Sequence, residues 1–239
     1  EAGRGVLGVY DAADGYRRVG ELDSFGVGPH DITLLPDGRT AAVANGGILT
    51  RPETGRAKLN LDSMRPSLAY LELDSGRLLE ERQLAPRLRQ LSIRHLALGR
   101  SGLLAAGMQW EGPAGARAPL LALDRGRGLE PLEAPEHALD GMAGYVGSVA
   151  IDGAEQVVAA SCPRGSRIAF WEVAGGRFLR MVEIADACAI GPAGGGGRFL
   201  TATGVGEVME IDAWTGTILS LGERSSVAYD NHLTMMKAA

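Results

Sequence analysis

The sequence predicts an all-β fold, and three observations support this. Many segments of five to eight residues are rich in Val, Leu, Ile and Ala and are bounded by Gly, Asp or Pro, without sustained helical periodicity. Glycine accounts for 35 of the 239 residues, roughly double its usual share. Hydrophobic residues still make up 45% of the chain. We therefore expect many tight turns around an apolar core.

One hairpin pattern recurs along the chain. It consists of an apolar strand, an acidic or small residue, a glycine turn and a second strand. The turn glycines are Gly15, Gly76, Gly128, Gly176 and Gly216. Asp and Gly tolerate the positive φ angles that tight hairpin turns require. The repeats lie roughly 40 to 60 residues apart, which brackets the period of a four-stranded propeller blade.

A second element follows each hairpin and consists of a short apolar strand, a turn on Asp, Ser or Gly, and another strand. The copies begin at His30, Arg94, Gly147, Cys188 and Asn231. In a propeller, this element supplies the innermost strand A and strand B, and the hairpin joins strand C to strand D. The sequence therefore predicts a β-propeller of four-stranded antiparallel blades.

This assignment gives about four full blades between His30 and Leu221, with partial blades on either side. The chain enters at a C–D hairpin and leaves after a strand A that starts at Asn231. Such a ring has open edges, which favour aggregation. We therefore expect one propeller domain over residues 1–239, with further blades upstream in the native protein.

Propeller topology places the starts of the A strands and the ends of the B strands on one face. The A starts supply His30, His95, Ser148, Cys188 and His232, and the B ends supply Asn45, Gln109, Cys162 and Arg164. Three of the four histidines thus occupy equivalent positions. Neutral imidazole is a preferred ligand of Cu, Fe and Zn, so His30, His95 and His232 are candidate ligands of a transition metal such as Fe or Cu, or of haem. The alternative is that they hydrogen-bond to water and backbone between blades, and that both cysteines are small apolar fillers.

The connection between strands B and C of the first full blade, Gly46 to Pro66, is unusually long and basic. It carries Arg51, Arg56 and Lys58, and long ordered loops are commonly functional. Together with Arg164 on the same face, these residues are candidates for binding an anionic cofactor, a carboxylate or an acidic partner. Equally, their charges could simply be solvated.

Other function classes find little support. The net charge of −5 argues against a nucleic-acid surface, and no apolar run is long enough for a membrane-spanning helix. The sequence lacks the GxSxG, GxxxxGK[ST] and HExxH motifs, so no catalytic residue is assigned.

Several motifs resemble a known family: GVGPHDITLLPDG, QLSIRHLALGRSGLLAAGMQ, GYVGSVAIDG, SCPRG, DACAIG and YDNHL. The chain is similar over essentially its whole length to bacterial periplasmic seven-bladed β-propellers of undefined function, encoded beside imelysin-type iron-uptake proteins and a di-haem oxidoreductase. The resemblance implies export by a twin-arginine signal and about two further blades before Glu1. It also implies imelysin-type or di-haem proteins as partners.

Three functions from different classes follow. The first is a non-catalytic periplasmic accessory protein of iron, other metal or haem uptake, which binds a metal or a partner at the histidine face. The second is a propeller enzyme of the lactonase or hydrolase type. The third is a protein-interaction scaffold that uses the rim and the long loop.

Overall fold

A computed structural model describes residues 3–55 and 57–234. The chain divides into two compact units, Glu1–Arg94 and His95–Ala239. The described residues form strands β1 to β18, five short 3-10 helices and one α-helix. The predicted all-β class is confirmed.

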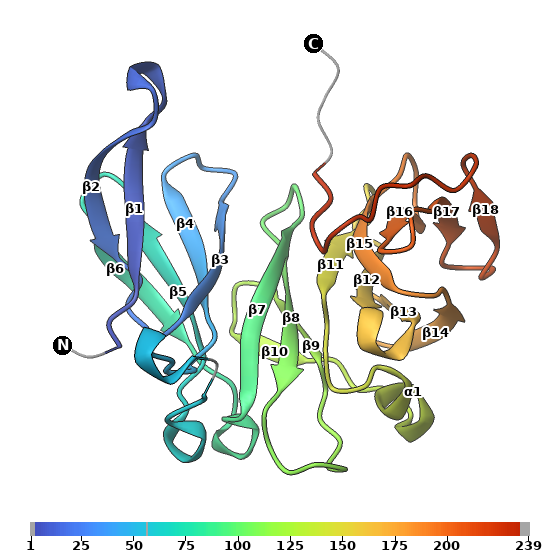
Figure 1. The fold of residues 1–239 in the computed structure, drawn as a ribbon, viewed down its shortest axis with the longest axis horizontal. Helices are drawn as coiled ribbons and strands as arrows, with labels where there is room; N and C mark the ends of the chain where they lie inside the picture. The colour runs from blue at the N-terminus through green and yellow to red at the C-terminus, as the bar shows by residue number, and fades with distance from the viewer. Residues whose placement is uncertain (1–2, 56, 235–239) are drawn as a thin grey trace. The chain divides into compact units, whose positions relative to one another are not determined.

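The first unit holds a two-stranded and a four-stranded antiparallel sheet, both in chain order (Figure 1). The strands are β1 (Val6–Asp11), β2 (Arg17–Asp23), β3 (Pro29–Leu34), β4 (Thr40–Asn45), β5 (Ser67–Glu72) and β6 (Arg77–Arg82). Its 3-10 helices are η1 (Ala12–Asp14), η2 (Pro52–Thr54), η3 (Leu61–Ser63) and η4 (Pro86–Leu88).

The second unit begins within β7 and contains three four-stranded sheets, each again in chain order. The first is formed by β7 (Leu91–Leu98), β8 (Leu104–Trp110), β9 (Leu121–Asp124) and β10 (Leu129–Pro131). The second is formed by β11 (Ser148–Ile151), β12 (Val157–Cys162), β13 (Arg167–Glu172) and β14 (Phe178–Glu183). The third is formed by β15 (Ala187–Pro192), β16 (Arg198–Thr203), β17 (Val208–Asp212) and β18 (Ile218–Ser220).

The four-stranded sheets confirm that A–B hairpins and C–D hairpins alternate along the chain, as predicted. All five turn glycines have positive φ, from +59° at Gly15 to +120° at Gly128, as the hairpin turns require. Each predicted C–D hairpin joins the last two strands of its sheet, and each A–B pair that begins between His30 and Cys188 forms the first two. The single domain and the seven blades of a complete ring stay predictions.

None of the six short helical elements among the described residues was predicted from the sequence. The helix α1 (Glu136–Gly141) contains His137 and precedes β11, and η5 (Pro163–Gly165) follows β12. In the part of the chain that the structure describes, no helix has both the length and the apolar character needed to cross a membrane.

The core of the second unit lies between neighbouring sheets, where β11 packs against β15 and β8. Phe170 of β13 and Phe199 of β16 are both fully buried, with ring centroids 5.6 Å apart. Burial decreases across the sheets, since all six residues of β12 are buried whereas all three of β18 are exposed. This gradient buries the inner strands and leaves the outer edge in water.

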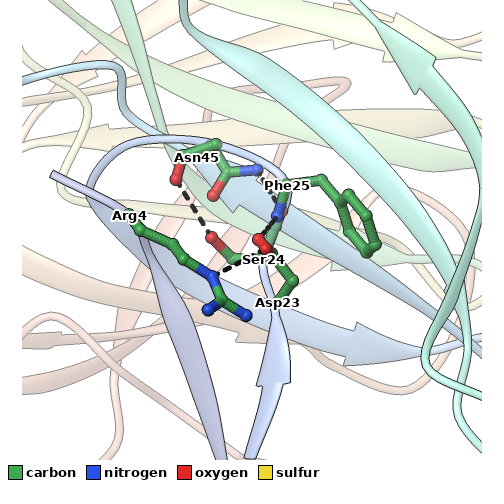
Figure 2. A network of polar contacts seen from close by, with 6 residues as sticks. Arg4, Asp23, Ser24, Phe25 and Asn45 are labelled. Carbon is green, nitrogen blue, oxygen red and sulfur yellow. Dashed lines mark hydrogen bonds and ion pairs between the residues drawn. The ribbon is translucent and has the colours of Figure 1, made fainter. Parts of the chain in front are cut away.

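In the first unit, a polar network joins the end of β2 to β4 (Figure 2). Arg4 Nε donates to Asp23 Oδ2 at 2.8 Å, and the backbone N–H of Phe25 donates to Asp23 Oδ1 at 2.7 Å. Buried Asn45 donates through Nδ2 to the carbonyl of Ser24 at 2.8 Å. The network fixes the chain where it passes from the two-stranded sheet into β3.

The strand predicted to start at Asn231 is wrong over the described residues 231–234, which have no regular secondary structure. Its remaining residues, Met235–Lys237, lie outside the described range. A strand needs a ladder partner. Just before this stretch, the N–H of Tyr229 donates to the carbonyl of Thr203 at 3.3 Å.

Candidate functional site

Two of the three predicted metal-binding histidines lie together in the second unit. His95 on β7 is 3% exposed, and His232 comes from the C-terminal segment 225–234 and is exposed. Their ring centroids are 5.2 Å apart and the ring planes are inclined by 58°. Two imidazoles from distant parts of the sequence therefore form one pair.

The C-terminal segment is held against the first strands of two sheets. Asn231 Nδ2 donates to Tyr145 Oη at 3.1 Å. A side chain at Gly191 on β15 would collide with Leu233, and a Cβ at Gly147 would lie 3.1 Å from Asn231 Oδ1. Figure 1 shows this red segment passing over β15 towards β11. The two glycines thus make room for the segment that carries His232.

Arg164, a predicted binding residue, contacts Tyr145, the residue that accepts a hydrogen bond from Asn231. Its guanidinium carbon is 4.4 Å from the centroid of the Tyr145 ring, a cation–π contact. The backbone of Tyr145 pairs with that of Gln109 at the end of β8. Arg164 also lines a hollow of about 390 Å³ with Trp110 and Arg117. Tyr145 therefore connects Arg164 to the segment that carries His232.

Strained backbone surrounds this cluster. Ala143, Ser166 and Asp186 have φ angles of +50°, +51° and +48°. They lie two residues from Tyr145, Arg164 and Cys188, respectively. A non-glycine residue in the left-handed region costs on the order of 1–3 kcal/mol, and such residues concentrate at functional sites. One other described non-glycine residue of the second unit, Glu155, also has a positive φ, of +54°.

Both cysteines of the face are buried free thiols with raised pKa values. Cys188 Sγ donates to Asp186 Oδ1 at 3.4 Å, and burial together with this carboxylate raises the pKa of Cys188 to about 11. Burial also raises the pKa of Cys162 far above its ordinary value. Without a bound metal ion, both are therefore neutral thiols near pH 7. Within the described residues, no group of three or more His, Cys, Asp or Glu side chains is arranged to hold a metal ion.

The third predicted histidine, His30, belongs to the first unit and has different surroundings. Its Nδ1 lies 3.1 Å from the backbone oxygen of Arg94. Because a carbonyl only accepts, Nδ1 carries the proton. His30 lines a hollow of about 330 Å³ together with Lys58, Ser92 and Arg94. Hydrogen bonding to backbone, the alternative considered for these histidines, is therefore observed for His30.

The predicted basic residues of the long loop do not share one place. Lys58 lines the hollow of His30, whereas Arg51 lines another hollow with Leu49 and Pro52. Arg56 lies outside the described residues. The loop is anchored by Asn60, whose Oδ1 accepts from the N–H of Leu49 at 2.7 Å and whose Nδ2 donates to the carbonyl of Gly47 at 2.8 Å.

A family model described as "Protein of unknown function (DUF1513)" matches residues 1–236. The chain belongs to this family. No curated protein matches it. The family assignment agrees with the resemblance to proteins of undefined function, and it gives no catalytic residue.

Solved structures similar to this DUF1513 protein support the fold alone. "Structure of U3-55K" matches at 15% identity and a TM-score of 0.57, covering 83% of this chain and 53% of that one. "Crystal structure of RRP9 WD40 repeats" matches at 15% identity and a TM-score of 0.54, covering 83% and 52%. "Kuenenia stuttgartiensis Hydrazine Synthase" matches at 14% identity and a TM-score of 0.60, covering 93% and 65%. The chain thus spans about half to two thirds of the length of these structures, and its fold is propeller-like.

Sequence reasoning did not select Tyr145, Asn231, Ser92 or Arg94 as site residues. Arg94 and Asn231 each directly precede a predicted metal-binding histidine. This position is the one sequence feature that could have indicated them. Tyr145 lies in an irregular stretch before β11, and Ser92 lies in an ordinary strand sequence. Their roles depend on tertiary contacts.

Proposed function

We propose that this DUF1513 protein is a non-catalytic accessory protein that holds a transition-metal ion between His95 and His232. The single observation that carries the proposal is the 5.2 Å separation of the two ring centroids. A metal about 2.0–2.1 Å from one nitrogen of each ring, with a near-tetrahedral angle between the bonds, places the centroids about 5 Å apart. The separation therefore suits one shared ion.

Two protein ligands leave further coordination positions for groups that arrive with the metal. Such a site holds its ion less firmly than a closed site with four protein ligands, which suits transfer to or from a partner. The resemblance described above supports a periplasmic location and imelysin-type or di-haem proteins as those partners. Arg164, in the same unit as the histidine pair, supplies positive charge for contact with an acidic partner.

The experiment is a calorimetric titration of untagged protein with Cu²⁺ and, separately, with Zn²⁺. We expect one ion per chain, bound more tightly for Cu²⁺ than for Zn²⁺. His232→Ala removes an exposed ligand without disturbing the core and weakens binding about 100-fold or more, since even outer-shell changes cost about 10–100-fold. His95→Ala gives a similar loss, with folding checked by circular dichroism.

His137→Ala is the matched control, because His137 lies on α1, away from the described pair. Its affinity should equal that of the unaltered protein. The proposal is wrong if the unaltered protein binds neither metal, or if His232→Ala binds as tightly as His137→Ala.

A further inference from the structure

The hollow of His30 in the first unit gathers basic side chains from three separate segments. His30 comes from β3, Lys58 from the long loop, and Arg94 from β7. The three are brought together by the fold, since they are far apart in the sequence. Such convergence of basic groups raises the local positive potential in an otherwise acidic protein.

Ser92 adds a hydroxyl group to this hollow. Its side chain is fully buried, and among the described residues its Oγ has no hydrogen-bond partner. A buried polar atom without a partner costs free energy and calls for an explanation. A Cβ at Gly46 would approach this Oγ to 2.7 Å, so the glycine leaves the space beside the hydroxyl open.

The loop that carries Lys58 is held by hydrogen bonds directly after this residue. Leu59 N–H donates to the carbonyl of Leu49 at 2.9 Å, next to the two hydrogen bonds of Asn60 described above. Further along, Gln90 Nε2 donates to the carbonyl of Leu61 at 3.2 Å. Lys58 therefore projects from fixed backbone, which lowers the entropy lost when it orders around a ligand.

We propose that this hollow binds a small anion bearing carboxylate or phosphate groups, with Lys58 and Arg94 as charged partners and Ser92 as a hydrogen-bond donor. Its volume of about 330 Å³ is at the lower end of ligand pockets, which span about 300–1,000 Å³. Charge-assisted hydrogen bonds from Lys and Arg are the strong contacts expected for such an anion. The site is independent of the histidine pair of the second unit.

The test is calorimetric titration of the whole chain with inorganic phosphate and, separately, with succinate. We expect one anion per chain. Lys58→Ala should weaken binding about tenfold, as expected for loss of one charge-assisted contact. A preference for phosphate identifies a phosphoryl ligand, and a preference for succinate identifies a carboxylate; each result supports the proposal.

Two further variants make the test specific. Arg51 belongs to the same loop and carries the same charge as Lys58, but it lines another hollow. The affinity of the Arg51→Ala variant for the anion should therefore stay within about twofold of that of the unaltered protein. Ser92→Ala should weaken anion binding without lowering the melting temperature, because the hydroxyl has no partner to lose in the described structure. The proposal is overturned if neither anion binds, or if Arg51→Ala weakens binding as much as Lys58→Ala does.

Discussion

The regions around His30 and His95 show how different the surroundings of two histidines predicted at equivalent positions are. Both lie on the first strand of a sheet. His30 shares one face of β3 with Ile32 and Leu34, which are 50% and 52% exposed, and it contacts a backbone carbonyl. His95 is buried, and its ring lies beside that of His232.

The difference arises from what covers each strand. In the second unit, the C-terminal segment contacts β15 of another sheet and contributes a second imidazole. In the first unit, the long loop contributes Lys58 instead. Strand position therefore does not determine the chemistry of the site. The covering segment does.

The largest effect on stability is expected at Asp152, in the turn between β11 and β12 of the second unit. The size of this effect should distinguish the second unit from the first. Asp152 is buried and accepts from the N–H groups of Gln156 and Val157, at 2.7 Å each, and of Gly197 on the next sheet, at 2.8 Å. Asp152→Ala leaves these donors without an acceptor and should destabilise the protein by about 2–3 kcal/mol. Urea unfolding measures the loss.

Asp37 is the comparison residue in the β3–β4 turn. It is exposed and accepts from the N–H groups of Arg39 and Thr40, at 2.9 Å each. Water can replace these bonds, so Asp37→Ala should destabilise less than Asp152→Ala. Asp152→Asn keeps an acceptor oxygen and should recover part of the loss. Equal losses for the two alanine variants would show that the two turns do not differ as described.

A smaller effect concerns Cys188, at the start of β15. Its pKa of about 11 leaves little thiolate at pH 8, so alkylation by iodoacetamide should be slow and should accelerate as the pH rises towards 11. Asp186→Asn removes the negative charge that disfavours the thiolate. It should lower the pKa of Cys188 and speed alkylation several-fold at pH 8.

Mass spectrometry of each cysteine provides the measurement. Cys162 is fully buried, lies elsewhere on the face and serves as the internal reference. Asn tolerates the left-handed backbone at position 186, so the substitution preserves the turn. An unchanged rate for Cys188 in Asp186→Asn would mean that the carboxylate does not control the thiol.

The sequence was sufficient to predict the sheets. Turn glycines such as Gly76 and Gly176, followed by alternating strand residues, mark the hairpins because only a few residue types adopt positive φ. The register was not predicted, and several strand pairs contain a shift in register, such as the pair β5–β6 between Tyr70 and Leu71. His30 and His95 were predicted to lie on A strands, and they lie on β3 and β7. His232 was predicted in the same way, but it lies outside any described strand.

The site itself depends on contacts that periodicity does not encode. The segment with His232 was predicted as a strand, but side-chain contacts of Asn231 and Leu233 fix it across other strands instead. Likewise, the cation-lined hollow results from three distant segments meeting near Ser92. Neither arrangement follows from local propensity, because both are decided by tertiary packing.

The central claim, that His95 and His232 share one metal ion, is tested most directly by anomalous diffraction from a crystal soaked with Cu²⁺. We predict a single strong anomalous peak about 2.0–2.1 Å from one ring nitrogen of each histidine. We also predict that this peak is lost in His232→Ala. A strong peak at another place in the protein, or the absence of any peak between these two rings, would contradict the claim.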